Sequence, residues 1–222
     1  MESCWLYNSC NHIDCDKFCI RRYKLDYLYN QAYVSLDQRK HIDLKLDANL
    51  VDKNNFIILS NIEKDIVSFI DKGNNLYIHS QMTGNGKTSW VLRLLQAYFN
   101  KIWANSNLEC KALFIHVPTF LLALKDNISE KSEYIRHIKN NILSADLIIW
   151  DDIATKSITS FESEHLLSMI DSRINSNKSN FFTSNLTDEE LHQALGDRLS
   201  SRILGTSYNF EFKGYDKRGI SS

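Results

Sequence analysis

The chain has 222 residues, of which 43% are hydrophobic and 24% charged, which is enough to bury one sizeable core and a small appendage. Its formal net charge of -1 excludes attraction of nucleic acid by a global basic field, so such a contact requires a local patch or an assembly of chains. Because no apolar run approaches the ~20 residues of a membrane span and no signal peptide is recognisable, we expect a cytoplasmic protein without membrane contact.

The N-terminal segment is crowded with cysteines. Cys4, Cys10, Cys15 and Cys19 fall within sixteen residues, and His12 lies among them. Four soft ligands so close together in a reducing compartment predict a tetrahedral Zn²⁺ site, in which His12 can replace one cysteine. The spacing lacks the paired C-x₂-C units of common zinc ribbons, so an iron–sulfur cluster and free thiols stay open as alternatives.

Large apolar groups recur every three or four positions from 18 to 33, which predicts an amphipathic helix. Residues 34–54 are polar and show no period, as expected for a linker. We therefore expect two parts: a Cys-rich module with its linker over residues 1–50, and a larger domain over residues 51–222. The aromatic side chains of this helix are suited to contact another protein. Equally, they can be buried against the zinc-binding segment.

Short apolar runs alternate with amphipathic segments through the rest of the chain. This alternation is typical of an α/β fold in which a parallel sheet is covered by helices on both faces. The expected strands are 75–80, 111–117, 145–150, 179–185 and 207–212, and the expected helices are 56–73 (in part), 86–103, 118–125, 132–144, 160–176 and 187–204.

Residues 80–89, SQMTGNGKTS, follow an expected strand and open an apolar helix, which is the context of a phosphate-binding P-loop. Its glycines let backbone N–H groups turn toward a phosphate, its lysine neutralises phosphate charge, and its threonine hydroxyl is a Mg²⁺ ligand. The expected nucleotide-binding residues in this segment are Gly84, Asn85, Gly86, Lys87, Thr88 and Ser89.

One position departs from the P-loop pattern. Gln81 stands where the pattern G-x-x-x-x-G-K-[ST] has its first glycine, and we expect this to restrict the backbone at the entrance of the loop. A glycine-rich turn before an ordinary helix is the alternative interpretation. The motif by itself does not distinguish kinases, GTPases and AAA+ ATPases.

The apolar run 145–150 ends in two acids, Asp151 and Asp152. The C-terminal ends of parallel strands face the ligand crevice, so we expect Asp151 to hold Mg²⁺ and Asp152 to orient or deprotonate the attacking water. A solvated turn or helix cap is the alternative for such a pair.

Another expected strand, FFTSN at 181–185, begins apolar and ends in polar groups, the last of which is Asn185. Asn185 has the chemistry to hydrogen-bond the attacking water or the γ-phosphate. The alternative is that Asn185 or Thr187 caps the helix that follows.

Arg198 and Arg202 are spaced four residues apart on one expected helix, and Arg218 follows near the C-terminus. Surface arginines usually form only a solvated face. In an oligomeric ATPase, one of them can instead reach the γ-phosphate bound by a neighbouring subunit.

Five segments in this order, the P-loop, DLIIWDD, FFTSNL, GDRLSSR and GYDKR, resemble the DnaC/DnaI-type helicase loaders of bacteria and phages over about residues 55–219. The resemblance implies an AAA+ ATPase of a bacterial or phage-infected cell that uses ATP/ADP and Mg²⁺, associates with itself when assembled, and delivers the replicative hexameric DNA helicase to single-stranded DNA. It also implies a domain without the C-terminal helical lid, because the chain stops soon after the last motif.

The resemblance assigns a role to each polar group. Since Asp152 stands where many AAA+ enzymes have the longer glutamate, it also implies slow hydrolysis. The implied roles are nucleotide and Mg²⁺ binding for Lys87 and Thr88, the Walker B pair for Asp151 and Asp152, the first sensor for Asn185, the arginine finger for Arg202 or Arg198, and the second sensor for Arg218.

Two other functions stay open. IstB-type transposition ATPases share the same motifs, so a transposition helper or an initiator-type ATPase that binds duplex DNA is one alternative. A small-molecule kinase is another, although it leaves the N-terminal cysteines and the TSN strand end unexplained. Loaders of this type commonly carry a small N-terminal module that docks the helicase, and the resemblance assigns this role to residues 1–50.

Overall fold

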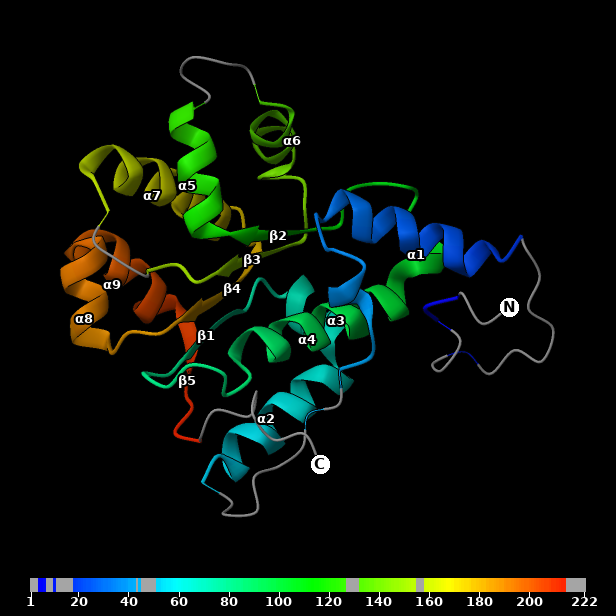
Figure 1. Cartoon of the computed structure of the whole chain (residues 1–222), viewed down its shortest axis with the longest axis horizontal. Helices are drawn as coiled ribbons and strands as arrows, with labels where there is room; N and C mark the ends of the chain where they lie inside the picture. Colours follow the sequence, from blue (N-terminus) through cyan, green and yellow to red (C-terminus); the bar gives the residue numbers. More distant parts are fainter. Residues whose placement is uncertain are drawn as a thin grey trace.

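A computed structural model of the chain describes residues 4–6, 10, 18–42, 44, 51–126, 132–154 and 158–214. Within these residues, parallel strands form one sheet in the order β2-β3-β4-β1-β5, and Figure 1 shows this sheet between two layers of helices. The order places β4 between β1 and β3. The strands are β1 Asn75–His79, β2 Ala112–His116, β3 Leu147–Asp151, β4 Ser179–Ser184 and β5 Ser207–Glu211.

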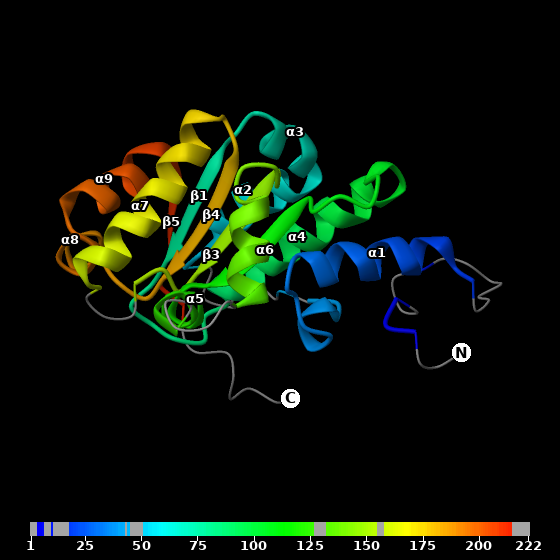
Figure 2. The ribbon, with the colours of Figure 1, turned by 90° about the horizontal axis from the view of Figure 1, so that it is seen from above.

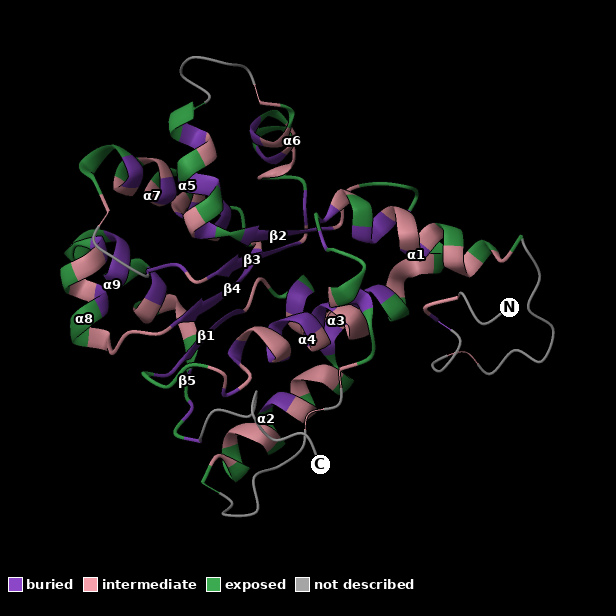
Figure 3. Cartoon of the chain, in the orientation of Figure 1, coloured by how far each residue is buried: buried purple, intermediate pink, exposed green. Residues whose placement is uncertain are grey.

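Side chains of successive strand residues point to opposite faces of the sheet, so each strand contributes to two hydrophobic cores. In β3, for example, Ile149 belongs to one core and Trp150 to the other, and both are fully buried. Strands β1, β3 and β4 are buried along their whole length, as the purple strands of Figure 3 show. Burial on both faces explains why the apolar residues of these strands are consecutive rather than alternating with polar ones, as Leu147 to Trp150 are in β3.

Each core is completed by its own set of helices, and Figure 2 shows the sheet between the two sets. None of these described helices has the length and hydrophobicity required to cross a lipid bilayer. One face carries α1 Ile20–Gln31, α2 Lys53–Lys64, α3 Ile66–Asp71 and α4 Lys87–Ile102; the other carries α5 Val117–Asp126, α6 Glu133–Asn141, α7 Ser160–Asn175, α8 Asp188–Leu195 and α9 Asp197–Thr206.

Local signals fix where several helices begin. Thr159 and Thr187 are the N-caps of α7 and α8, and each forms a reciprocal capping box with a glutamate three residues later. The helices expected over 187–204 are two, α8 and α9, and Gly196, with φ of 80°, lies between them. The expected mixed segment 56–73 is likewise two helices, α2 and α3.

The described residues before position 50 pack on the main core. Leu25, Leu28 and Tyr29 of α1 are buried, and the Tyr29 ring meets Phe99 of α4 edge to face with centroids 5.0 Å apart. The expected linker contains a short 3₁₀ helix, Asp37–Arg39, and the first residues of α2. The boundary that we placed near residue 50 therefore does not separate two hydrophobic cores in the described residues.

A buried arginine stabilises the sheet at the N-terminal ends of its strands, opposite the P-loop. The guanidinium of Arg173, fully buried on α7, donates to the Asn180 side chain at 2.8 Å and to four backbone carbonyl groups. Burial lowers the pKa of Arg173 to about 9. These bonds satisfy carbonyl groups at the N-terminal ends of β3 and β4 and so hold the two strands in position.

Candidate functional site

The P-loop connects β1 to α4, as the sequence predicts. Gly84 and Gly86 have φ of 72° and 97°, values that favour glycine because it lacks a Cβ atom. Gln81 does not belong to the described non-glycine residues with positive φ. Its φ is therefore outside the left-handed region, and the expected restriction at the loop entrance stays a prediction.

The Lys87 side chain folds into the loop. Its ammonium group is buried and donates to the carbonyl oxygens of Met82 at 2.9 Å and Ser80 at 3.3 Å, and to Oδ1 of Asn85 at 3.2 Å. Asn85 is buried as well and donates to the Ser80 hydroxyl. The loop is thus held around a cation at the N-terminus of a sixteen-residue helix, where the helix dipole also favours an anion.

Thr88 and Asp151 meet beside the loop. The Thr88 hydroxyl donates to Oδ1 of Asp151 at 2.9 Å, and the Thr183 hydroxyl of β4 donates to the same oxygen at 2.8 Å. Burial raises the pKa of Asp151, while these two hydrogen bonds act in the opposite direction. The structure therefore brings together the two residues that the sequence assigns to Mg²⁺.

Asp152 is held in an uncommon backbone conformation. Its φ is 53°, in the left-handed region, and its N–H donates to the Thr183 hydroxyl at 2.9 Å. The Asn185 amide donates to Oδ1 of Asp152 at 3.1 Å. Thr187 is the N-cap of α8, so the capping alternative is confirmed for Thr187 and wrong for Asn185, whose amide lies beside the second acid.

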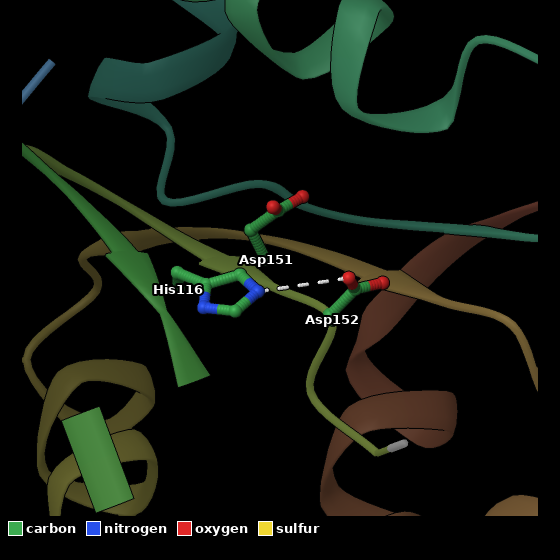
Figure 4. Close-up of side chains that lie close together, drawn as sticks. All are labelled: His116, Asp151 and Asp152. Atoms are coloured by element: carbon green, nitrogen blue, oxygen red, sulfur yellow. Dashed lines mark ion pairs between the residues drawn. The ribbon is translucent and has the colours of Figure 1, made fainter. Parts of the chain in front are cut away.

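His116, at the end of β2, completes the cluster. Its Nε2 lies 3.8 Å from Oδ2 of Asp152, and Figure 4 shows the imidazole facing that carboxylate. Sequence reasoning missed His116 and Thr183. The signal was present, because both are polar residues in the C-terminal half of an apolar strand, and the parallel register pairs His116 with Asp151.

The donor set fits a hard divalent cation. A threonine hydroxyl and an aspartate carboxylate lie in direct contact beside an anion-binding loop, and oxygen ligands of this kind together with nucleotide phosphates are what Mg²⁺ prefers. Lys87, Thr88, Asp151, Asp152 and Asn185 converge where β1, β3 and β4 end. The arrangement can bind a nucleoside phosphate and hold a carboxylate near its terminal group.

The arginines do not join this cluster. Arg202 of α9 pairs with Asp171 of α7 at 2.8 Å, and Arg198 is exposed on the same helix. Within the described part of the chain, neither forms a salt bridge with Asp151 or Asp152. Arg218 lies outside the described residues.

The predicted zinc ligands are only partly described. Cys4, Cys10 and Cys19 are half-buried and form no disulfide among the described residues, whereas His12 and Cys15 lie outside the described residues. Among the described side chains, the group of three or more with metal-ligand spacing is His116, Asp151 and Asp152, and it includes no cysteine. The zinc site stays a prediction.

Comparisons with known proteins agree with this architecture. A family model described as the Bacterial DnaA ATPase domain matches residues 42–207. No curated protein sequence matches the chain. The solved structures similar to the chain include the DnaC helicase loader, at 19% identity and a TM-score of 0.60, covering 73% of this chain and 91% of that one. DnaI is similar at 21% identity and a TM-score of 0.59, covering 82% of this chain and 92% of that one. AMPPCP-bound DnaA from Aquifex aeolicus is similar at 18% identity and a TM-score of 0.57, covering 77% of this chain and 48% of that one.

Proposed function

Because the chain belongs to the bacterial DnaA ATPase-domain family, an AAA+ fold, we propose that it is an ATP-dependent loader that delivers a replicative DNA helicase to single-stranded DNA. One observation carries the choice of loader. The chain is similar to the DnaC helicase loader over 73% of its own length and 91% of that structure. Family membership in an ATPase domain also disfavours the kinase alternative.

The residues around the loop have different roles in the proposed ATP hydrolysis. The loop N–H groups and the Lys87 ammonium bind the phosphates, and Thr88 with Asp151 would hold Mg²⁺. When bound, Mg²⁺ neutralises charge on the phosphate oxygens. Asp152 orients the attacking water and accepts its proton, while Asn185 fixes the Asp152 carboxylate through their hydrogen bond.

Two further groups complete the proposed site. Arg202, or Arg198 beside it, acts on the nucleotide of a neighbouring chain in an assembly. Arg218 contacts the nucleotide from the C-terminal segment. Support for the second assignment comes from the segment after β5, because the Phe212 carbonyl accepts a hydrogen bond from Asn85 of the loop at 3.5 Å.

We place helicase docking on the N-terminal part of the chain. The first turn of α1 and the residues before it expose Phe18, Ile20 and Tyr23 at 77%, 66% and 60%, whereas the opposite side of α1 is buried. Exposed aromatic groups of this kind are typical anchors of protein interfaces. The Cys-rich segment ahead of them, which we propose is held by Zn²⁺, would fix their position.

The experiment that tests the loader function is capture of a purified replicative hexameric helicase by the full chain. Deleting residues 1–50 would be uninformative, because the buried face of α1 is part of the main core. The double variant Phe18→Ser, Tyr23→Ser should lose capture and keep ADP binding. Leu122→Ser, at a residue 62% exposed on α5, is the matched control and should change neither. Capture that survives the double variant would place docking elsewhere.

Family membership favours one second candidate, an initiator-type ATPase that binds duplex DNA. Binding of the isolated chain to duplex and single-stranded oligonucleotides of equal length, with ATP, separates the two functions. A loader requires the helicase for stable single-strand contact. An initiator binds duplex DNA without it, and such binding would favour the second candidate.

A further inference from the structure

Three potential metal ligands meet where β2 and β3 end. One ligand atom from each of His116, Asp151 and Asp152 lies within 4.8 Å of the others, and Figure 4 shows the imidazole directed at the Asp152 carboxylate. We infer that these three side chains form a binding site for a first-row transition metal ion such as Mn²⁺. The ion can occupy this site when no nucleotide is bound to the protein. An ion there would engage Asp152 and so restrain hydrolysis; only this consequence rests on the proposed function.

Each ligand is oriented by a neighbour that uses its other polar atom. The Nδ1 atom of His116 hydrogen-bonds the Thr119 hydroxyl at 2.8 Å, so with the ring proton on Nδ1 the Nε2 lone pair faces Asp152. Such an outer partner fixes the tautomer and ring orientation of metal-binding histidines.

The two carboxylates are oriented in the same way. Both hydroxyl groups that donate to Asp151, from Thr88 and Thr183, use Oδ1, and the Asn185 amide uses Oδ1 of Asp152. Within the described residues, the second oxygen of each carboxylate accepts no hydrogen bond. One oxygen of each acid is therefore held and the other is available to an ion.

The ligand types select the class of ion. Two carboxylates and one imidazole suit Mn²⁺, Fe²⁺, Co²⁺ or Zn²⁺, whereas Mg²⁺ prefers oxygen ligands throughout. Neighbouring ligand atoms about 2.1 Å from an octahedral metal lie roughly 3.0 Å apart. The ligand atoms of the three residues, 3.8 Å apart for Nε2 of His116 and Oδ2 of Asp152 and within 4.8 Å of one another as a group, must therefore close in by side-chain rotation when the ion binds. His116 is half-exposed, which leaves solvent access for water to fill the remaining positions.

The test uses Mn²⁺ alone with the full, nucleotide-free chain. Mn²⁺ is chosen because soft thiolates select other metals, so the N-terminal cysteines do not interfere. Electron paramagnetic resonance should show bound Mn²⁺, and electron spin-echo modulation should show coupling to one imidazole ¹⁴N. His116→Asn should remove the nitrogen coupling and weaken Mn²⁺ binding more than about tenfold, since even the loss of an outer-shell partner costs that much. His165→Asn, on α7, is the matched control and should leave both signals unchanged.

The outcomes separate the two proposals. Absence of Mn²⁺ binding, or Mn²⁺ bound without nitrogen coupling in the wild type, overturns the metal site. ADP binding is measured on the same preparation without added Mn²⁺. Normal ADP binding with no Mn²⁺ site leaves the proposed function intact, whereas a nitrogen-coupled Mn²⁺ site in a protein that does not bind ADP overturns the function alone.

Discussion

The Thr88 hydroxyl donates a hydrogen bond of 2.9 Å to Oδ1 of Asp151, which lies 63 positions away in the sequence. Thr88 follows β1 and Asp151 ends β3, and these strands are not neighbours, because β4 lies between them. Thr183 of β4 bridges the gap by donating to the same oxygen. Three strands thus position one carboxylate, which is buried and accepts two hydrogen bonds.

Lys87→Ala should weaken ADP binding by about 1.5–3 kcal/mol, roughly 10- to 150-fold, because it removes the charged donor inside the loop. The measurement is isothermal titration with ADP and Mg²⁺. Lys101→Ala, at the other end of α4, is the matched control and should bind ADP as the wild type does. Equal affinity in the Lys87 variant would refute the P-loop assignment.

Asp151→Asn should abolish Mg²⁺-dependent hydrolysis and raise the thermal stability of the protein. Burial raises the pKa of Asp151, so the folded chain holds this proton to higher pH than the unfolded chain does. The free energy of unfolding therefore falls as pH rises from the unfolded to the folded pKa, and it stays lower at neutral pH. Asparagine removes that penalty, and each kcal/mol regained appears as about 2–4 °C in Tm.

The pH dependence provides the check on this explanation. The gain in Tm from Asp151→Asn should be present at pH 7 and should shrink below about pH 3.9, where the carboxyl is neutral in both states. A gain of equal size at both pH values would mean that charge burial is not its cause.

Arg173→Met should lower the free energy of unfolding by about 3–5 kcal/mol, since it leaves several buried carbonyl groups and the Asn180 side chain without their donor. Urea unfolding followed by circular dichroism measures the change. Arg136→Met removes an exposed arginine of α6 that pairs with Glu133, and it should cost less than about 1 kcal/mol. Comparable losses in the two variants would contradict the role of the buried network.

Arg202→Ala should leave ATP affinity nearly unchanged and reduce hydrolysis in assembled chains. Arginine fingers contribute roughly 10³–10⁵ in rate in GTPases, so even a partial loss is measurable. To act on a neighbour, Arg202 must release Asp171, and such a half-exposed pair is worth at most about 1 kcal/mol. Asp171→Ala, which frees the guanidinium, should therefore not reduce the rate.

Action on the neighbouring chain is tested by mixing. Arg202→Ala protein and Asp152→Asn protein should each hydrolyse ATP more slowly than the wild type, but mixed neighbours can combine an intact arginine with an intact acid. Recovered hydrolysis in the mixture confirms the arrangement. If co-assembled mutants that bind ATP recover nothing, Arg198 becomes the candidate.

Freshly isolated, reduced protein should contain about one zinc per chain, and replacing Cys15 and Cys19 by Ser should release it, because hydroxyl groups are poor Zn²⁺ ligands at neutral pH. Elemental analysis measures the metal. Cys110→Ser, at a cysteine distant in the sequence from this cluster, is the control and should keep the zinc. Protein that carries no metal would refute the site.

Much of the site could be predicted from the sequence because its motifs are local. Gly84, Gly86, Lys87 and Thr88 are contiguous, and a loop between an apolar strand and an apolar helix fixes their arrangement wherever the fold places them. Continuous apolar runs likewise predict a two-faced parallel sheet, because each strand is buried on both sides.

Only the tertiary structure decided which polar strand ends meet. The order β2-β3-β4-β1-β5 brings His116, Asp151 and Thr183 to one edge, and no local pattern specifies that order, since it follows from how the whole chain packs. The same holds for α1, whose period predicts a helix but not that Tyr29 packs on Phe99 of α4. A motif of contiguous residues can therefore be predicted from the sequence. Contacts between distant segments cannot, because they depend on how all the apolar faces are buried together.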